Sequence, residues 1–261
     1  MNLNLNGKTA IVCGSTQGIG LAAAHQLANQ GATIILVARD EKKLLAVKSE
    51  LSVNSGQKHQ FLVADFSKAG ELSAKVEEFL KDKTVEILVN NTGGPTGGPI
   101  ISAAIDEFRN AFNQHLICNH IMVQAVLPGM KKVGFGRIIN VISTSVKQPL
   151  NGLGVSNTVR GAVANWSKTL ANELGQFNIT VNNVLPGATD TSRLKEIITA
   201  KASKTGGSYD SVLKEMSDAS PMKRIATAAE VANAIGFLAS PAASYINGIN
   251  LPVDGGRTSS L

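Results

Sequence analysis

Short apolar runs alternate with longer amphipathic runs along most of the chain. The short runs have four to seven residues rich in β-branched side chains, which is typical of buried strands. The expected strands are TAIVCG from Thr9, TIILVA from Thr33, FLVAD, EILVN, GRIINVIS, ITVNNVLPG and INLPVDGG. The expected helices are LAAAHQLANQG, DEKKLLAVKSEL, ELSAKVEEFLKD, residues 102–132, residues 155–174 and EVANAIGFLAS. This alternation predicts βαβ units and a parallel, doubly wound α/β sheet covered by helices on both faces.

We find no repeat, linker or low-complexity segment, so residues 1–261 are predicted to form a single domain. The segment 191–221 interrupts the pattern, because it is long, polar and rich in Lys, and it follows the end of a strand. Open α/β sheets bind ligands at the carboxyl ends of their strands. We therefore favour a lid over a substrate site for this segment, with a solvated surface excursion as the alternative.

Composition narrows the classes of function. The net charge is +6, but the Lys and Arg residues are scattered, and aromatic residues make up only 4%. Neither observation favours nucleic-acid binding, and attraction of an anionic cofactor or substrate explains the charge equally well. No apolar run is long enough to span a membrane, and no signal peptide is recognised. The two cysteines have no CxxC spacing, which favours a reducing cytoplasm.

A glycine-rich loop follows the first predicted strand. In CGSTQGIG, Gly14, Gly18 and Gly20 lead directly into a helix. We expect Gly14 to permit a sharp exit from the strand, Gly18 to let the backbone approach a pyrophosphate, and Gly20 to let the helix pack closely. The loop therefore predicts a dinucleotide site, with a turn that binds no ligand as the weaker alternative.

The end of the second strand discriminates between the two pyridine nucleotides. An acidic residue there would pair with the ribose hydroxyls of NAD, but Ala38 and Arg39 occupy the position. A cation suits the 2′-phosphate of NADP, so NADP(H) is predicted over NAD(H). Alternatively, Arg39 pairs only with Asp40 or Glu41 at the start of the next helix.

Further motifs follow in order: VADF, LVNNTGG, GRIINVIS, LPGATDT and INGINLPVDGG. With the glycine loop, they make the chain resemble the short-chain dehydrogenase/reductase superfamily, on the branch of 3-oxoacyl-carrier-protein reductase-like enzymes. The resemblance extends from Gly7 to Gly256 and implies a Rossmann-type sheet of seven parallel strands. It also implies an oxidoreductase that acts on a small carbonyl or alcohol, and a homotetramer or homodimer built through the helices after the fourth and fifth strands.

The resemblance also implies the residues that contact the cofactor. Asp65 is expected near the adenine, the turn from Asn90 to Gly93 beside the adenosine ribose, and Pro186 to Thr191 around the nicotinamide. The expected contacts are Gly14, Ser15, Thr16, Gly18, Ile19, Gly20, Arg39, Asp65, Phe66, Asn91, Thr92, Gly93, Pro186, Gly187, Thr189 and Thr191. The loop GGPTGGP after Asn91 either lines the substrate side or is a plain cluster of turns.

The catalytic positions depart from the family, which uses Asn, Ser, Tyr and Lys, the last two spaced Tyr-x-x-x-Lys. Ser143 is kept, but Ser156 stands at the Tyr position, Arg160 at the Lys position and His115 at the Asn position. Tyr209 and Tyr245 are the only tyrosines, and neither lies on this helix.

This change removes the usual proton donor. Hydride transfer to a carbonyl leaves negative charge on oxygen, which a Tyr with a lowered pKa both stabilises and protonates. Ser156 is a poor acid and Arg160 does not release a proton at ordinary pH, so His115 is the most plausible substitute acid. Ser156 and Arg160 could also act together as a preorganised site for an oxyanion.

Three functions therefore remain open. The leading hypothesis is an NADP(H)-dependent oxidoreductase with a non-standard proton donor. The second is a nucleotide-binding protein without turnover, acting as a sensor or assembly subunit. Nucleic-acid binding rests only on net charge. No metal site is predicted, because His115 and His120 lie on different faces of one helix and the other histidines lie elsewhere.

Overall fold

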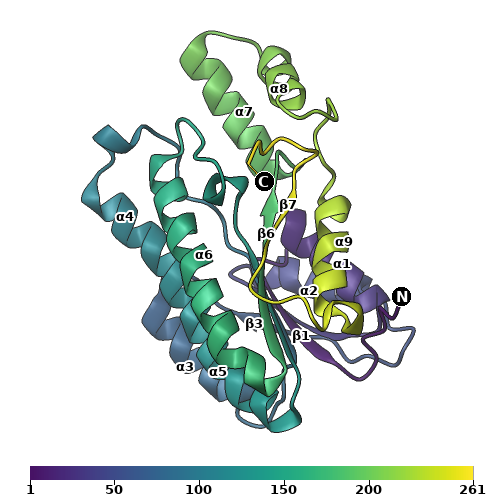
Figure 1. Ribbon diagram of the computed structural model, residues 1–261. Helices are drawn as coiled ribbons and strands as arrows, with labels where there is room; N and C mark the ends of the chain where they lie inside the picture. Colours follow the sequence, from purple (N-terminus) through teal and green to yellow (C-terminus); the bar gives the residue numbers. More distant parts are fainter. Residues whose placement is uncertain (261) are drawn as a thin grey trace.

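Seven parallel strands form one sheet in the computed structural model, which describes residues 1–260 (Figure 1). The strands are β1 (Thr9–Cys13), β2 (Thr33–Ala38), β3 (Gln60–Val63), β4 (Ile87–Asn90), β5 (Gly136–Val141), β6 (Ile179–Pro186) and β7 (Asn250–Val253). Their order is β3-β2-β1-β4-β5-β6-β7, and every neighbouring pair is parallel. The strand order reverses between β1 and β4, where this architecture opens a crevice for a ligand. The predicted Rossmann-type fold is confirmed.

Helices cover both faces of the sheet, as the alternating pattern predicts. The helices are α1 (Gly18–Asn29), α2 (Glu41–Glu50), α3 (Ala69–Leu80), α4 (Ile105–Phe112), α5 (Cys118–Val133), α6 (Gly154–Leu174), α7 (Ser192–Thr205), α8 (Tyr209–Asp218) and α9 (Ala228–Ala239). Helices α1, α2 and α9 pack on one face, and α3, α5 and α6 pack on the other. Within residues 1–260, every helix is too short or too polar to cross a membrane.

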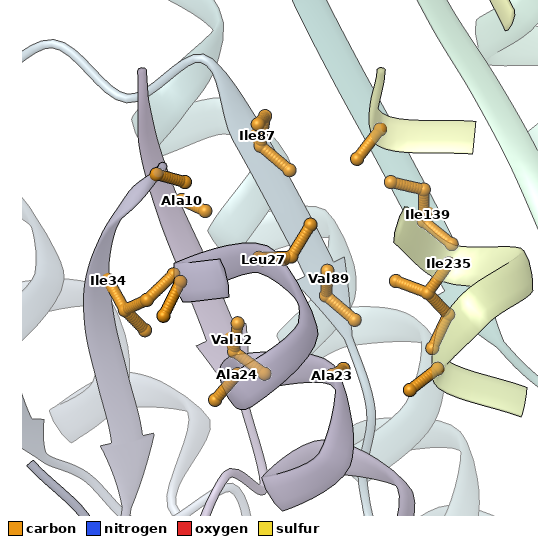
Figure 2. Packing of buried hydrophobic residues seen from close by; sticks show 14 of the residues in the cluster. Ala10, Val12, Ala23, Ala24, Leu27, Ile34, Ile87, Val89, Ile139 and Ile235 are labelled. Atoms are coloured by element: carbon orange, nitrogen blue, oxygen red, sulfur yellow. The ribbon is translucent and has the colours of Figure 1, made fainter. Parts of the chain in front are cut away.

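The strands are buried on both faces, which explains their nearly continuous apolar runs. On the α1 side, Ala23, Ala24 and Leu27 of α1 lie over β1 and its neighbours, and Ile235 of α9 lies near Ile139 of β5 (Figure 2). All five side chains are at most 1% exposed. Burial of this kind contributes about 25 cal/mol for each Å² of apolar surface, so this layer holds the ends of β1 and β4 in place.

A ladder of asparagine side chains joins the four strands from β4 to β7. Asn90, Asn140, Asn183 and Asn250 are in register on neighbouring strands, and hydrogen bonds of 2.8 to 3.1 Å link each to the next. Asn140 also donates to the hydroxyl of Ser167 on α6 at 2.9 Å. Since buried amides are costly unless paired, the ladder fixes the relative positions of these strands and of α6.

Two regions differ from the helices expected from the sequence. The predicted helix over 102–132 is divided into α4 and α5 by a π-helical turn, Asn113–Ile117. The polar segment 191–221 contains α7 and α8, which the polar composition did not predict. They stand beyond the carboxyl ends of the strands (Figure 1). Leu194, Ile198, Ala202 and Val212 form a small core between these two helices.

Candidate active site

The glycine loop after β1 leaves no room for a side chain at Gly14 or Gly20. Gly14 has φ of +60°, and a Cβ there would lie 2.6 Å from the carbonyl oxygen of Asn91. A Cβ on Gly20 would collide with the carbonyl oxygen of Gly14. The side-chain amide of Asn91 donates a hydrogen bond from Nδ2 to the carbonyl oxygen of Cys13 at 3.2 Å, and this bond joins the end of β4 to the loop. Both glycines are therefore required by close backbone approach.

The loop presents an uncapped helix end. Gln17 occupies the N-cap position of α1 without a side-chain hydrogen bond, and the first turn contains no acidic residue. The first amide N–H groups of a helix have no partner within the helix, and they favour an anion. Ser15 is buried, with its Oγ 3.4 Å from the carbonyl oxygen of Val37, while Thr16 is partly exposed. Ile19 packs against the core on the α1 face.

Arg39 is exposed at the end of β2 and is available for a ligand. The alternative partner Asp40 instead caps α2, where its carboxylate accepts from the backbone N–H of Lys43 at 3.1 Å. Within residues 1–260, no ion pair contains Arg39. Hydrogen bonds from the backbone N–H and the hydroxyl of Ser67 and, more weakly, the charge of Arg39 hold the pKa of Asp65 below its usual value. The carbonyl oxygen of the next residue, Phe66, accepts from the thiol of Cys118 at 3.2 Å.

The loop after β6 reaches back to the glycine loop. Pro186 ends the strand, and a Cβ on Gly187 would lie 2.8 Å from the Cα of Asp254. Thr189 donates from its hydroxyl to the carbonyl oxygen of Gly187 at 3.0 Å. Thr191 caps α7, accepting from the N–H of Leu194 at 3.2 Å, and its methyl carbon would lie 3.0 Å from a Cβ on Gly18. The structure thus brings the two predicted halves of the nucleotide site together.

Ser143, Ser156 and Arg160 all lie at the carboxyl end of β5 or on the first turns of α6. The Oγ of Ser143 accepts from the N–H of Ser145 at 3.1 Å, and Ser156 is partly buried. Arg160 is 7% exposed and donates from Nη1 to the carbonyl oxygen of Val141 at 3.0 Å. Burial lowers its pKa to about 10, so the guanidinium remains charged at neutral pH. It is absent from the ion pairs of residues 1–260.

His115 lies in the π-helical turn and is 1% exposed. Burial and then the charge of Arg160 lower its pKa from 6.5 to about 2. The ring is therefore neutral at physiological pH, and a nearby arginine is expected to shift it in this direction; the role of His115 as a substitute acid stays a prediction. Its Nδ1 lies 2.5 Å from the Oγ1 of Thr92, in a hydrogen bond, and its Nε2 is buried without a partner within residues 1–260. A neutral imidazole can still position a neighbour or accept a proton transiently.

The loop GGPTGGP is fixed on two sides. Gly98 forms a parallel bridge with Leu153, and its N–H donates to the carbonyl oxygen of Gly152 at 2.7 Å, just before α6. From the other side, Arg193 of α7 donates to the carbonyl oxygen of Pro95 at 2.9 Å. These contacts place the loop between α6 and the segment 191–221, and its role on the substrate side stays a prediction.

Sequence reasoning missed the contact between Thr92 and His115 and the contact between Arg193 and Pro95. Each joins residues far apart in the chain, so no local motif marks it. The replacement of the expected Asn by His115 was the one available signal. Within residues 1–260, His, Cys, Asp and Glu side chains form no group of three or more that could hold a metal ion.

Comparison with known proteins identifies the family. Residues 14–258 match the family model described as Enoyl-(Acyl carrier protein) reductase. The chain is 34% identical to the uncharacterized oxidoreductase YvrD of Bacillus subtilis, with all of both chains covered. It is 32% identical to the 3-oxoacyl-[acyl-carrier-protein] reductase FabG of Pseudomonas aeruginosa, covering 97% of this chain and 98% of that one. The chain therefore belongs to the short-chain dehydrogenase/reductase family of oxidoreductases, and it is similar to the FabG branch.

Solved structures agree with this assignment. The crystal structure of L-sorbose reductase from Gluconobacter frateurii, complexed with NADPH and L-sorbose, superposes with a TM-score of 0.93 at 32% identity, covering all of both chains. The structure of YwfH, an NADPH-dependent reductase of bacilysin biosynthesis, has a TM-score of 0.89 at 28% identity and covers 97% of this chain and 99% of that one.

Proposed function

We propose that this protein is an NADP(H)-dependent oxidoreductase that reduces a small carbonyl compound or oxidises an alcohol. The observation that carries the proposal is an intact cofactor cradle, the site at which the strand order reverses between β1 and β4. There the backbones of Gly14, Gly20 and Asn91 approach one another closely beside the uncapped N-terminus of α1. The free guanidinium of Arg39 favours the 2′-phosphate of NADP over NAD. NADPH in the similar L-sorbose reductase supports the same choice.

The remaining contacts follow from the same cradle. Asp65 and Phe66 would lie at the adenine, the turn Asn91 to Gly93 at the adenosine ribose, and Pro186, Gly187, Thr189 and Thr191 at the nicotinamide. Bound there, the cofactor supplies or removes a hydride. Arg160 is fixed by the carbonyl oxygen of Val141 and would bind the nicotinamide ribose in place of the family's lysine.

The chain's own residues would then stabilise the negative charge that develops on the substrate oxygen. The hydroxyls of Ser143 and Ser156 would donate hydrogen bonds to it, and the buried charge of Arg160 would stabilise it. None of these groups is an acid that titrates near neutrality, so the oxygen would take its proton from water, either directly or through the hydroxyl of Ser156, which water reprotonates in the same step. Loss of general acid catalysis typically costs about 10²–10⁴ in rate, while positioning supplies about 7–11 kcal/mol. A slow reductase of an activated carbonyl remains feasible.

A second candidate function is nicotinamide-nucleotide binding without turnover, in a sensor or assembly subunit. The observation that favours it is the replacement of three of the four catalytic positions, together with the neutral, buried state of His115. The two candidates share the cradle and differ only in the chemical step.

Steady-state turnover separates the two candidates. We expect slow, NADPH-dependent reduction of some members of a panel of ketones and quinones. The variant Ser156→Tyr/Arg160→Lys restores the family's pair and should raise the rate by about 10²-fold or more. Arg160→Lys alone is the matched control and should not. NADPH binding with no turnover by either protein would favour the second candidate.

We also propose that the protein is a homotetramer or homodimer joined through α4 and α6. An apolar groove of about 400 Å³ lies between these helices and is lined by Phe108, Arg109, Phe112, Asn113, Thr158, Val159 and Ala162. Phe112 is 40% exposed there, and contiguous exposed apolar surface of this kind marks interaction sites. The family builds its oligomers through the corresponding helices, so a second copy is the proposed occupant.

Light scattering after size exclusion tests the assembly. The wild-type protein should elute as a dimer or tetramer, and Phe112→Glu should dissociate it. Tyr245→Glu is the matched control, because Tyr245 is fully exposed and is not among the residues that line the groove. A monomeric wild type would contradict the proposal.

A further inference from the structure

Thr92 and His115 form a pair that links the end of β4 to the π-helical turn between α4 and α5. The distance of 2.5 Å between Thr92 Oγ1 and His115 Nδ1 is that of a short hydrogen bond. His115 is fully buried, whereas Thr92 is partly exposed in the turn that continues from Asn91. The pair therefore joins the cofactor turn to the interior beside Arg160. A π-helical turn often accompanies a functional site.

Two arrangements of the proton are possible for a neutral ring. If the hydroxyl of Thr92 donates to Nδ1, then Nε2 carries the hydrogen, and a buried N–H donor is left without a partner. If Nδ1–H donates to Thr92, then Nε2 carries a lone pair instead. Unpaired buried donors are rarer than unpaired buried acceptors, which favours the second arrangement.

The charge of Arg160 favours the same arrangement. The guanidinium offers only donors and is close enough to His115 to lower the pKa of the ring. A lone pair on Nε2 is attracted to this cation, whereas an N–H dipole in its place would be repelled. Arg160 uses Nη1 on the carbonyl oxygen of Val141, and within residues 1–260 none of its N–H groups forms a hydrogen bond with His115 Nε2, so the attraction acts through space.

We propose that Thr92 is a positioning residue that accepts a hydrogen bond from His115 Nδ1–H and so fixes the neutral ring with an unprotonated Nε2 in the interior. The pair thereby fixes the turn after β4, whose residues Asn91 to Gly93 would lie at the adenosine ribose of the cofactor. Only this last consequence rests on the proposed function, because the tautomer is a property of the protein without any ligand.

Nitrogen-15 NMR of the histidine side chains tests the tautomer directly. His59 provides an internal reference of the opposite kind, because its Nδ1 accepts from the N–H of Ile34 at 3.0 Å and its Nε2 must donate to the carbonyl oxygen of Ser52 at 2.8 Å. The signals of His115 are assigned by their loss in His115→Gln. We expect protonation at Nδ1 for His115 and at Nε2 for His59. Protonation of His115 at Nε2 would overturn the proposal.

Variants at position 92 test the positioning role. Thr92→Ser keeps the hydroxyl and should keep the Nδ1–H form, whereas Thr92→Val is similar in shape and should lose that preference. NADPH affinity, measured by fluorescence titration, should fall by about threefold to tenfold in Thr92→Val and recover in Thr92→Ser. Thr169→Val, on the exposed side of α6, is the matched control.

The outcomes of the two measurements are distinguishable. An unchanged tautomer in Thr92→Val, or equal NADPH affinity in Thr92→Val and the wild type, would overturn the positioning role. If the wild type binds no NADPH at all, the proposed function fails, while the NMR result for His115 still decides the tautomer.

Discussion

Arg193 of α7 donates a hydrogen bond from Nη2 to the carbonyl oxygen of Pro95, at 2.9 Å. The two residues come from segments almost 100 positions apart, on either side of the predicted substrate site. Close by, Thr191 packs on Gly18 of the phosphate loop. The segment 191–221 is thus attached to both the cofactor side and the substrate side. A role of the segment as a lid stays a prediction, and these contacts are where it can be tested.

Arg193→Ala should loosen that attachment. A hydrogen bond from a charged group contributes about 1.5–3 kcal/mol, and the side chain is 42% exposed, so we expect the lower end, about a tenfold rise in KM for the carbonyl substrate. Amide hydrogen exchange should accelerate in α7 and leave β5 unchanged. Lys204→Ala, on the same helix, is the control. Equal exchange in wild type and Arg193→Ala would show that this contact does not hold the segment.

Arg39→Ala should weaken NADPH binding selectively. The loss of one charged contact to the 2′-phosphate corresponds to about a tenfold to hundredfold rise in Kd. NADH lacks this phosphate, so its Kd should not change. Lys42→Ala, on the exposed surface of α2, is the matched control. A parallel loss of affinity for both nucleotides would mean that Arg39 has only a structural role.

His115 should make the protein sensitive to acid. The native pKa is about 2, whereas the unfolded ring titrates at its ordinary 6.5, so only the unfolded state takes up a proton as the pH falls below 6.5. The stability of the native state is therefore undiminished above that pH and falls below it, by up to about 1.4 kcal/mol per pH unit.

Comparison with His115→Asn isolates this contribution. Between about pH 7 and about pH 5, the free energy of unfolding of the wild type should fall by about 2 kcal/mol more than that of the variant. Urea unfolding at each pH measures the difference, and His120→Asn, at an exposed position on α5, should behave like the wild type. Parallel pH profiles for the wild type and His115→Asn would contradict the buried neutral ring.

Asn140→Leu should destabilise the fold by at least about 2 kcal/mol. The side chain is fully buried and bonds to Asn90, Asn183 and Ser167, whose polar groups would lose their partner. Each buried group left unpaired costs about 1–3 kcal/mol. Thermal and chemical unfolding measure the change. Asn151→Ala, at an exposed position, should stay within about 0.5 kcal/mol of the wild type.

The sheet and the cofactor cradle were predictable because their signals are local. Runs such as TIILVA have strong strand propensity, and the glycines of CGSTQGIG follow a strand directly, so their spacing alone indicates the loop. By contrast, α7 and α8 were not predicted, because their polar exposed faces outweigh the few apolar residues between them. A cytoplasmic location, proposed from cysteine usage, stays a prediction.

The candidate catalytic positions stay a prediction, and the sequence indicates where they lie better than it indicates their chemical state. The replacement of the expected Tyr and Lys by Ser156 and Arg160 is visible in the sequence. The state of His115 is not visible there, because it depends on burial against α6 and on the charge of Arg160, 45 residues away. The π-helical turn and the hydrogen bond to Thr92 arise from the same packing, which no short motif encodes.

Isothermal titration calorimetry with NADPH and NADH tests the central claim most directly. The claim is that the pyridine-nucleotide cradle is intact although the usual proton donor has been replaced. We predict saturable binding of one NADPH per chain, with affinity for NADPH at least about tenfold higher than for NADH. No heat of binding with either nucleotide, for a protein that is folded by circular dichroism, would contradict the account.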